Sequence, residues 1–257
     1  MHESFIARVK RVYQQNGFAG FLKKGFRAAI KSLEPLKAII YPYANWRLPK
    51  DVRKSYTAED AIHYGIDHFW GFISSTQVHS EIVSLGKIVE QLRPKTVVEI
   101  GTSKGGTLFI WARLASKEAH LVSIDMPGGE NNWAFPAWKE PFYKKFASKG
   151  QHIDILRGDS QSPEMLARLK SILGGKPIDY LFIDADHTYE GVKKDYLLYS
   201  PLVRQGGVIA FHDIAKQAPI TGCGVDRLWN EAKQGKKFQE FIENPNQGWG
   251  GIGVIFV

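Results

Sequence analysis

The sequence predicts an α/β fold in which helices cover both faces of a doubly wound, mostly parallel sheet of seven strands with an antiparallel last strand. Two observations lead to this prediction. From residue 77 onward, short runs rich in β-branched residues alternate with helical segments, and this alternation is typical of parallel sheets with helical crossovers. The last two apolar runs are separated only by a Gly- and Asn-rich turn, which favours an antiparallel pair that closes the sheet.

The predicted elements follow one another in a regular order along the chain. A helix is expected over 77–92, and the run Thr96–Ile100 after it contains the valines and the isoleucine that favour a strand. Further strands are expected at 119–125, 152–157, 178–184, 208–212, 238–242 and 253–257. Helices at 107–115, 163–173 and 189–203 supply the crossovers between these strands.

The distribution of charge divides the chain into two parts. The 257 residues fit one medium-sized domain with an appendage, and their net charge is +8. Residues 1–50 contain ten lysines and arginines against two glutamates, whereas residues 51–257 contain equal numbers of basic and acidic side chains. We therefore expect a basic helical arm with its connector at 1–55 and an electrically neutral domain at 56–257.

The basic arm has apolar residues at helical spacing, interrupted at Asn16-Gly17, which predicts two short amphipathic helices. Three prolines, Pro35, Pro42 and Pro49, then indicate an irregular connector laid over a surface. Two interpretations of the arm stay open. Its residues 1–40 contact an anionic membrane surface, as basic amphipathic helices do, or its apolar stripes pack on the domain or on a second copy in a homo-oligomer.

Several classes of protein are excluded by the composition. The single cysteine, Cys223, forms no intrachain disulfide and builds no multi-thiolate zinc site, which favours a reducing compartment. Charged residues interrupt the N-terminal segment before it forms an apolar stretch, so it does not resemble a secretory signal. No window approaches the roughly 20 consecutive apolar residues of a spanning helix. These observations predict a cytoplasmic protein that does not cross a membrane.

Polar residues follow the predicted strands at their carboxyl ends, where open α/β sheets bind ligands. The first strand runs into a glycine-rich turn with Gly101 and Gly105 before a helix, which suits close approach of a ligand to the backbone. The next strands in chain order end in Asp125, then Asp159 and Ser160, then Asp184 and His187, and finally His212 and Asp213. Gln77 and Glu81, in the preceding helix, are expected to face the same edge.

These motifs resemble the class I S-adenosylmethionine-dependent methyltransferases, which have a Rossmann-like fold. Within them the sequence is similar to the O-methyltransferases of sugars and natural products, including macrolide-sugar and cephalosporin hydroxylase-like proteins. The resemblance covers residues 70–215 and implies S-adenosylmethionine as the cofactor, with a hydroxyl of a saccharide or glycosylated metabolite as the acceptor. It implies these cofactor-binding residues: Glu99, Gly101, Thr102, Ser103, Gly105, Asp125, Asp159 and Ser160.

The resemblance also implies a reacting centre. Several similar O-methyltransferases hold a divalent cation with residues that correspond here to Asp184, His212 and Asp213. Because one of these ligands is an imidazole, Mn²⁺, Fe²⁺ or Zn²⁺ suits the set at least as well as Mg²⁺. Asp184 and His187 are the implied catalytic residues, since an imidazole near neutral pKa can take the proton of the acceptor hydroxyl.

Two other functions are compatible with the sequence. An NAD(P)-dependent oxidoreductase also has a glycine-rich turn followed by an acid, but Gly101, Gly105 and Gly106 do not form the Gly-x-Gly-x-x-Gly pattern. The second alternative is a peripheral membrane or assembly module that retains a cofactor-binding fold. A nucleic-acid partner is not expected, because no base-reading motif accompanies the basic arm.

Overall fold

A computed structural model of the chain describes residues 34–128 and 135–257, so the two amphipathic helices expected within residues 1–33 lie outside the described residues. The described part begins with helix α2 (Glu34–Asp51). Its side chains Ile40, Ala44 and Leu48 are buried in the hydrophobic core. The prediction of an irregular connector here is wrong, because burial of this apolar stripe stabilises a helix despite the hydrogen bonds lost at Pro42 and Pro49.

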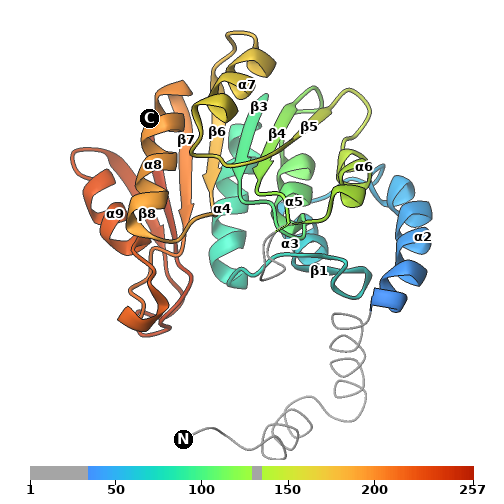
Figure 1. Cartoon of the computed structure of the whole chain (residues 1–257), viewed down its shortest axis with the longest axis horizontal. Helices are drawn as coiled ribbons and strands as arrows, with labels where there is room; N and C mark the ends of the chain where they lie inside the picture. The colour runs from blue at the N-terminus through green and yellow to red at the C-terminus, as the bar shows by residue number, and fades with distance from the viewer. Residues whose placement is uncertain (1–33, 129–134) are drawn as a thin grey trace, which may run out of the picture.

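The main sheet contains seven strands in the order β5-β4-β3-β6-β7-β9-β8 (Figure 1). Five neighbouring strands run parallel, whereas β9 is antiparallel to both β7 and β8. The predicted fold class is confirmed. The strands are β3 (Thr96–Ile100), β4 (His120–Asp125), β5 (His152–Arg157), β6 (Ile178–Ile183), β7 (Val203–His212), β8 (Lys237–Phe241) and β9 (Ile252–Phe256).

Helices cover both faces of the sheet, and each face has its own hydrophobic cluster (Figure 1). On one face, α3 (Ala58–Ile66), α4 (His79–Leu92), α5 (Gly106–Leu114) and α6 (Glu140–Lys144) supply the buried side chains. On the other face, α7 (Pro163–Leu173), α8 (Tyr189–Tyr199) and α9 (Val225–Ala232) do so. This two-sided packing fixes the sheet and leaves the carboxyl ends of its parallel strands free to carry loops.

The sequence did not predict the elements between residues 58 and 74, the short helices α6 and α9, or the 3-10 turns. Helix α3 begins after Thr57, whose side chain and that of Asp60 form a reciprocal capping box. A short antiparallel pair, β1 (Asp67–His68) and β2 (Ile73–Ser74), follows it. The 3-10 turns are η1 (Phe69–Gly71), η2 (Ala137–Lys139), η3 (Ser200–Leu202) and η4 (Pro219–Thr221). Helix α8 ends before the predicted residue 203 because Pro201, in η3, has no amide hydrogen to continue it.

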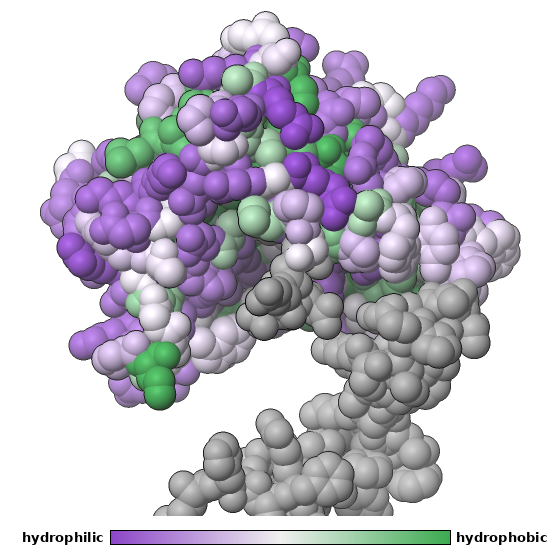
Figure 2. All heavy atoms as spheres, viewed as in Figure 1, coloured by the Kyte–Doolittle hydropathy of each residue, from purple (hydrophilic) through white to green (hydrophobic). Residues whose placement is uncertain are grey.

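The surface of the described residues is mainly hydrophilic, as expected when the apolar side chains are buried in the two hydrophobic clusters. Figure 2 shows a face on which hydrophilic residues dominate and hydrophobic residues form small separate areas. Among residues 34–128 and 135–257, no helix combines the length and the apolar character that crossing a bilayer requires.

Candidate active site

The site lies where the order of the strands reverses, between the carboxyl ends of β3 and β6. From β3 the chain builds outward through β4 and β5, and then returns to add β6 and β7 on the other side. The loops after β3 and β6 meet at this point, since the amide of Asp184 donates to the carbonyl of Ile100 at 2.8 Å. A Cβ atom on Gly101 would overlap the carbonyl oxygen of Asp184. Open α/β sheets bind ligands at such switch points.

The loop between β3 and α5 is held in an unusual backbone conformation. Gly101, Ser103 and Gly105 have positive φ angles of 94°, 46° and 76°. Asp125, at the end of β4, accepts hydrogen bonds from the amides of Thr102 and Ser103 at 3.2 and 2.6 Å through one carboxylate oxygen. Burial raises the pKa of Asp125 to about 6. The structure therefore brings together Gly101, Thr102, Ser103, Gly105 and Asp125, as the sequence predicts.

Glu99 lies beneath this loop and has no exposed surface. Its two carboxylate oxygens accept hydrogen bonds from the hydroxyl of Thr102 and from the indole of Trp111, each at 3.0 Å. Burial raises the pKa of Glu99 to about 8. We therefore expect Glu99 to affect a bound cofactor by positioning the loop rather than by touching it.

Asp159 and Ser160, the predicted cofactor-binding residues after the third predicted strand, follow β5. The carboxylate of Asp159 accepts from the amide of Gln161 at 2.8 Å and is exposed. The hydroxyl of Ser160 donates to Asp195 at 2.7 Å. Asp195 is fully buried in α8, and burial raises its pKa to about 7. Sequence reasoning missed Asp195, because nothing in the pattern of α8 distinguishes this acid from one on the solvent side.

Four predicted residues meet at the ends of β6 and β7. One oxygen of Asp184 lies 3.2 Å from Nδ1 of His212 and 3.5 Å from Nε2 of His187. One oxygen of Asp213 lies 3.3 Å and 3.4 Å from the same two nitrogen atoms. His212 is 5% exposed, whereas the side chain of His187 is 49% exposed and borders the open edge. We call these four residues the acid–histidine cluster.

The charges of this cluster balance one another. Burial opposes a charge on His212, but the carboxylates of Asp184 and Asp213 outweigh it and raise the pKa of His212 to about 10. Burial also opposes ionisation of Asp184, yet His212 and His187 lower its pKa to about 2. The hydrogen bond to Asp184 raises the pKa of His187. The two carboxylates thus keep a positive charge between them.

A divalent cation fits this arrangement. Asp184, His212 and Asp213 each offer a ligand atom, and these atoms lie within 4.8 Å of one another. Nδ1 of His212 is the ring nitrogen that faces both carboxylates. Two carboxylates and one imidazole form a donor set for Mn²⁺, Fe²⁺ or Zn²⁺ and also accept Mg²⁺, with the cation taking over the charge that the proton on His212 supplies here.

Further side chains fix the two acids in place. Gln77 donates to the second oxygen of Asp184 at 2.9 Å, as expected for a residue that faces this edge. Gln217 and the amide of Gly250 donate to the second oxygen of Asp213 at 3.0 and 2.8 Å. These two contacts were not foreseen, because Gln217 lies in the irregular loop that follows Asp213 and Gly250 lies in a distant turn.

Glu81, the other residue expected at this edge, has a different role. It is 1% exposed and accepts hydrogen bonds from the amides of Glu243 and Gly251 at 3.0 and 2.8 Å, and from Gln247 at 2.8 Å. It therefore anchors the turn between β8 and β9. This turn also contains Gly250, so Glu81 supports Asp213 indirectly.

The sheet order, the glycine-rich loop and the acid at the end of β4 agree with the Rossmann-like fold that methyltransferases have. Residues 98–214 match the family model of a methyltransferase domain. This match includes the glycine-rich loop, Asp125 and the acid–histidine cluster, so these residues lie in a methyltransferase domain.

Curated relatives match about half of the chain. Uncharacterized protein R132 of Acanthamoeba polyphaga mimivirus is 34% identical over 146 residues, which are 55% of this chain and 62% of that protein. The chain spans less than two thirds of the length of the curated relatives it matches.

Two solved structures share the fold. The O-methyltransferase TomG from Streptomyces achromogenes, in complex with SAM, matches with a TM-score of 0.55 and 18% identity, over 79% of this chain and 91% of its own. The methyltransferase MycE, in complex with Mg, SAH and mycinamycin VI, matches with a TM-score of 0.51 and 14% identity, over 79% of this chain and 54% of its own.

Proposed function

We propose that this chain transfers the methyl group of S-adenosylmethionine to a hydroxyl of a small molecule, of the saccharide or glycosylated-metabolite class, with the help of a divalent cation. One observation carries the proposal. The acid–histidine cluster adjoins the glycine-rich loop directly, because the residue that follows β3, Gly101, abuts the backbone of Asp184. A methyl donor on the loop and a hydroxyl on the cluster would therefore be neighbours.

The cofactor would be held by the loop after β3 and the ends of β4 and β5. S-adenosylmethionine supplies an electrophilic sulfonium methyl group. Gly101 and Gly105 keep the loop free of side chains, and Asp125 ends β4 where an acid can accept hydrogen bonds from ribose hydroxyls. Asp159 and Ser160 border the same edge after β5. The complex of TomG with SAM supports this part of the proposal.

The cation would be held by Asp184, His212 and Asp213. When bound, it lowers the pKa of a coordinated hydroxyl and fixes the position of the oxygen. Gln77, Gln217 and the amide of Gly250 hold the two carboxylates in place through their second oxygens. Such outer contacts orient metal ligands. The presence of Mg in the MycE complex supports a cation here.

His187 would take the proton of the acceptor hydroxyl. It is the one member of the acid–histidine cluster with a half-exposed side chain, and both carboxylates contact its Nε2 atom. These contacts orient the ring and stabilise the imidazolium that forms when the proton arrives. The loss of that proton leaves the oxygen ready to attack the methyl group.

Two measurements test the proposal. We expect S-adenosylhomocysteine to raise the melting temperature of the protein and NADH to leave it unchanged, since ligands stabilise the state that binds them. We also expect labelled S-adenosylmethionine to label a saccharide-containing acceptor from a cell extract, and a chelator to abolish that transfer. Stabilisation by NADH alone would favour the oxidoreductase instead. Transfer at full rate in the presence of chelator would remove the cation from the proposal.

The basic arm suggests where the enzyme works. We propose that residues 1–40 bring it to anionic membrane surfaces, a proposal supported by the concentration of positive charge in the first 50 residues. Full-length protein should sediment with liposomes that contain phosphatidylserine, and a chain starting at residue 52 should not. Because α2 packs on the domain, a chain starting at residue 34 is the better-folded control. Equal sedimentation of all three chains contradicts the proposal.

A further inference from the structure

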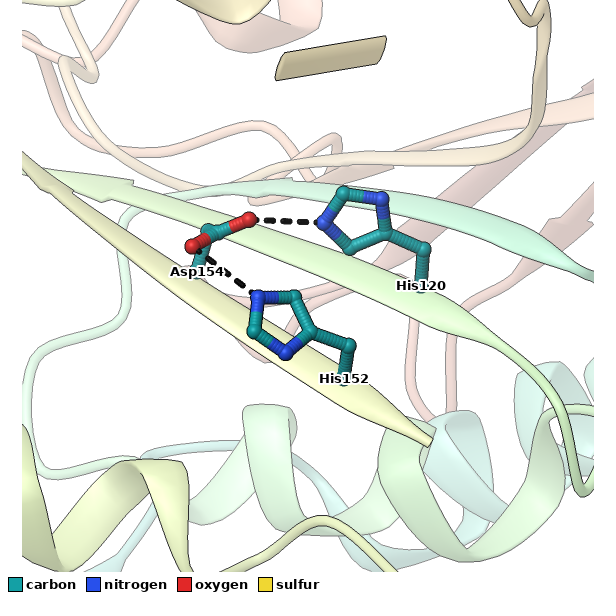
Figure 3. Close-up of side chains that lie close together, drawn as sticks. All are labelled: His120, His152 and Asp154. Carbon is teal, nitrogen blue, oxygen red and sulfur yellow. Dashed lines mark hydrogen bonds and ion pairs between the residues drawn. The ribbon is translucent and has the colours of Figure 1, made fainter. Parts of the chain in front are cut away.

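A second group of metal-ligating side chains lies outside the acid–histidine cluster. It consists of His120 at the start of β4 together with His152 and Asp154 near the start of β5. Figure 3 shows that both imidazole rings point toward the carboxylate of Asp154. The proposed methyl transfer makes no use of these residues.

The pairing of two strands fixes this group. His120 and His152 are direct partners in the parallel register of β4 and β5, so both side chains project from the same face of the sheet. Asp154 follows His152 by two residues and projects from that face as well. The centres of the two imidazole rings are 5.2 Å apart. The backbone of the sheet therefore positions all three groups without help from a flexible loop.

The contacts within the group are close to those of a coordination shell. Nε2 of His120 lies 2.8 Å from one oxygen of Asp154, and Nε2 of His152 lies 3.2 Å from the other (Figure 3). The ligand atoms of the three residues lie within 4.8 Å of one another. Bonds of ~2.0–2.2 Å to a tetrahedral ion separate neighbouring ligand atoms by little more than 3 Å, so only small side-chain movements are needed.

The group is open to solvent and remote from the acid–histidine cluster. The side chain of His152 is 68% exposed, and those of His120 and Asp154 are 23% and 29% exposed. It lies at the amino ends of its strands, whereas the active site follows their carboxyl ends. Along β4, the five residue steps from His120 to Asp125 correspond to roughly 17 Å. An ion at one position cannot share ligands with an ion at the other.

We propose that His120, His152 and Asp154 bind a divalent transition-metal ion of the zinc class. Two imidazole nitrogens and one carboxylate favour Zn²⁺, Co²⁺ or Ni²⁺ over Mg²⁺, which prefers oxygen ligands. Three protein ligands leave the remaining positions to water. The ion would take the place between the two imidazoles and the carboxylate that their direct contacts occupy now.

The consequence of binding is a link between β4 and β5. In the seven-stranded sheet β5 is an edge strand that pairs only with β4, and edge strands are the least protected part of a sheet. An ion bound by one residue of β4 and two of β5 would hold the pair together. Because the unfolded chain does not preserve the three ligands in this geometry, binding stabilises the folded state.

The test is a titration of full-length protein, freed of any histidine tag, with Zn²⁺ by calorimetry and with Co²⁺ by visible absorption. His152→Ala and Asp154→Asn should each lower the affinity of this site at least about 100-fold, since two ligands hold an ion far more weakly than three. His152 is exposed and asparagine has the shape of aspartate, so neither change should unfold the chain. Asp213→Asn, which damages the acid–histidine cluster, should leave this site intact.

A matched control is available in a second pair of neighbouring imidazoles. His63 and His79 have ring centres 5.6 Å apart but belong to no three-ligand group among the described residues. His79→Ala should therefore leave Zn²⁺ binding unchanged. Zn²⁺ should also raise the melting temperature of the wild type by about 5 °C at saturating concentrations, and this rise should be absent in His152→Ala. Unchanged binding in His152→Ala, or loss of all binding in Asp213→Asn, would overturn the proposal.

Discussion

Replacing His187 with alanine is expected to lower the turnover of methyl transfer by about 100- to 10,000-fold, the contribution of a positioned general base. The affinity for S-adenosylhomocysteine should change little. His187 follows β6 and contacts Asp184 and Asp213, whereas the glycine-rich loop belongs to β3 and α5. Because its side chain is half-exposed, truncation leaves no buried cavity. Single-turnover assays beside calorimetric titration of S-adenosylhomocysteine measure the two effects separately.

The control for this variant is His79→Ala, which removes another exposed imidazole that lies outside the acid–histidine cluster. It should retain full activity. If His187→Ala is as active as the wild type, His187 is not the base. If it loses affinity for S-adenosylhomocysteine in proportion to its activity, His187 supports the cofactor site instead.

Replacing Gly101 with alanine is expected to damage both cofactor binding and stability. Gly101 has a φ angle of 94°, and a Cβ atom here would overlap the carbonyl oxygen of Asp184. The backbone conformation and the overlap together should lower the free energy of unfolding by ~3 kcal/mol. The loops after β3 and β6 must move apart to make room for the alanine side chain. The affinity for S-adenosylhomocysteine should therefore fall at least about tenfold. Urea denaturation and calorimetry measure these changes.

Gly235→Ala separates the two causes. Gly235 also has a positive φ angle, 69°, but a Cβ atom there would meet nothing within 4 Å. It should therefore show only the backbone cost of ~1 kcal/mol and no change in cofactor affinity. If Gly101→Ala behaves like Gly235→Ala, the close approach of the two loops is not what the site requires.

The resemblance implied the members of the acid–histidine cluster, and each of them lies at or just after the end of a predicted strand. In a parallel sheet all carboxyl ends lie at one edge, so topology alone brings Asp184, His187, His212 and Asp213 to the same side. The sequence could not show that His212 is buried between two carboxylates, and this position determines the pKa of His212. It also could not assign Asp195 to Ser160, because that contact depends on how α8 packs across the loop after β5.

In the segment that forms α2, by contrast, the prediction from local sequence was wrong. Local rules predicted an irregular segment because prolines interrupt helices, yet α2 is a helix whose buried stripe packs on the core. Tertiary packing outweighed local preference there. The same limitation applies to the histidine group of β4 and β5. His120 is 32 positions from His152 and 34 positions from Asp154, and these residues become neighbours only through strand register.

The sequence by itself determined the seven strands of the main sheet, the helices α4, α5, α7 and α8, the glycine-rich loop and the side chains at the carboxyl ends of the strands. These follow from local periodicity and from chain order, which need no knowledge of contacts. Only the tertiary structure decided that Glu99 supports the loop from beneath, that Glu81 anchors the last turn and that His120, His152 and Asp154 converge. Each of these roles depends on burial or on pairing between distant segments. Neither can be predicted from the residues adjacent to a position in the chain.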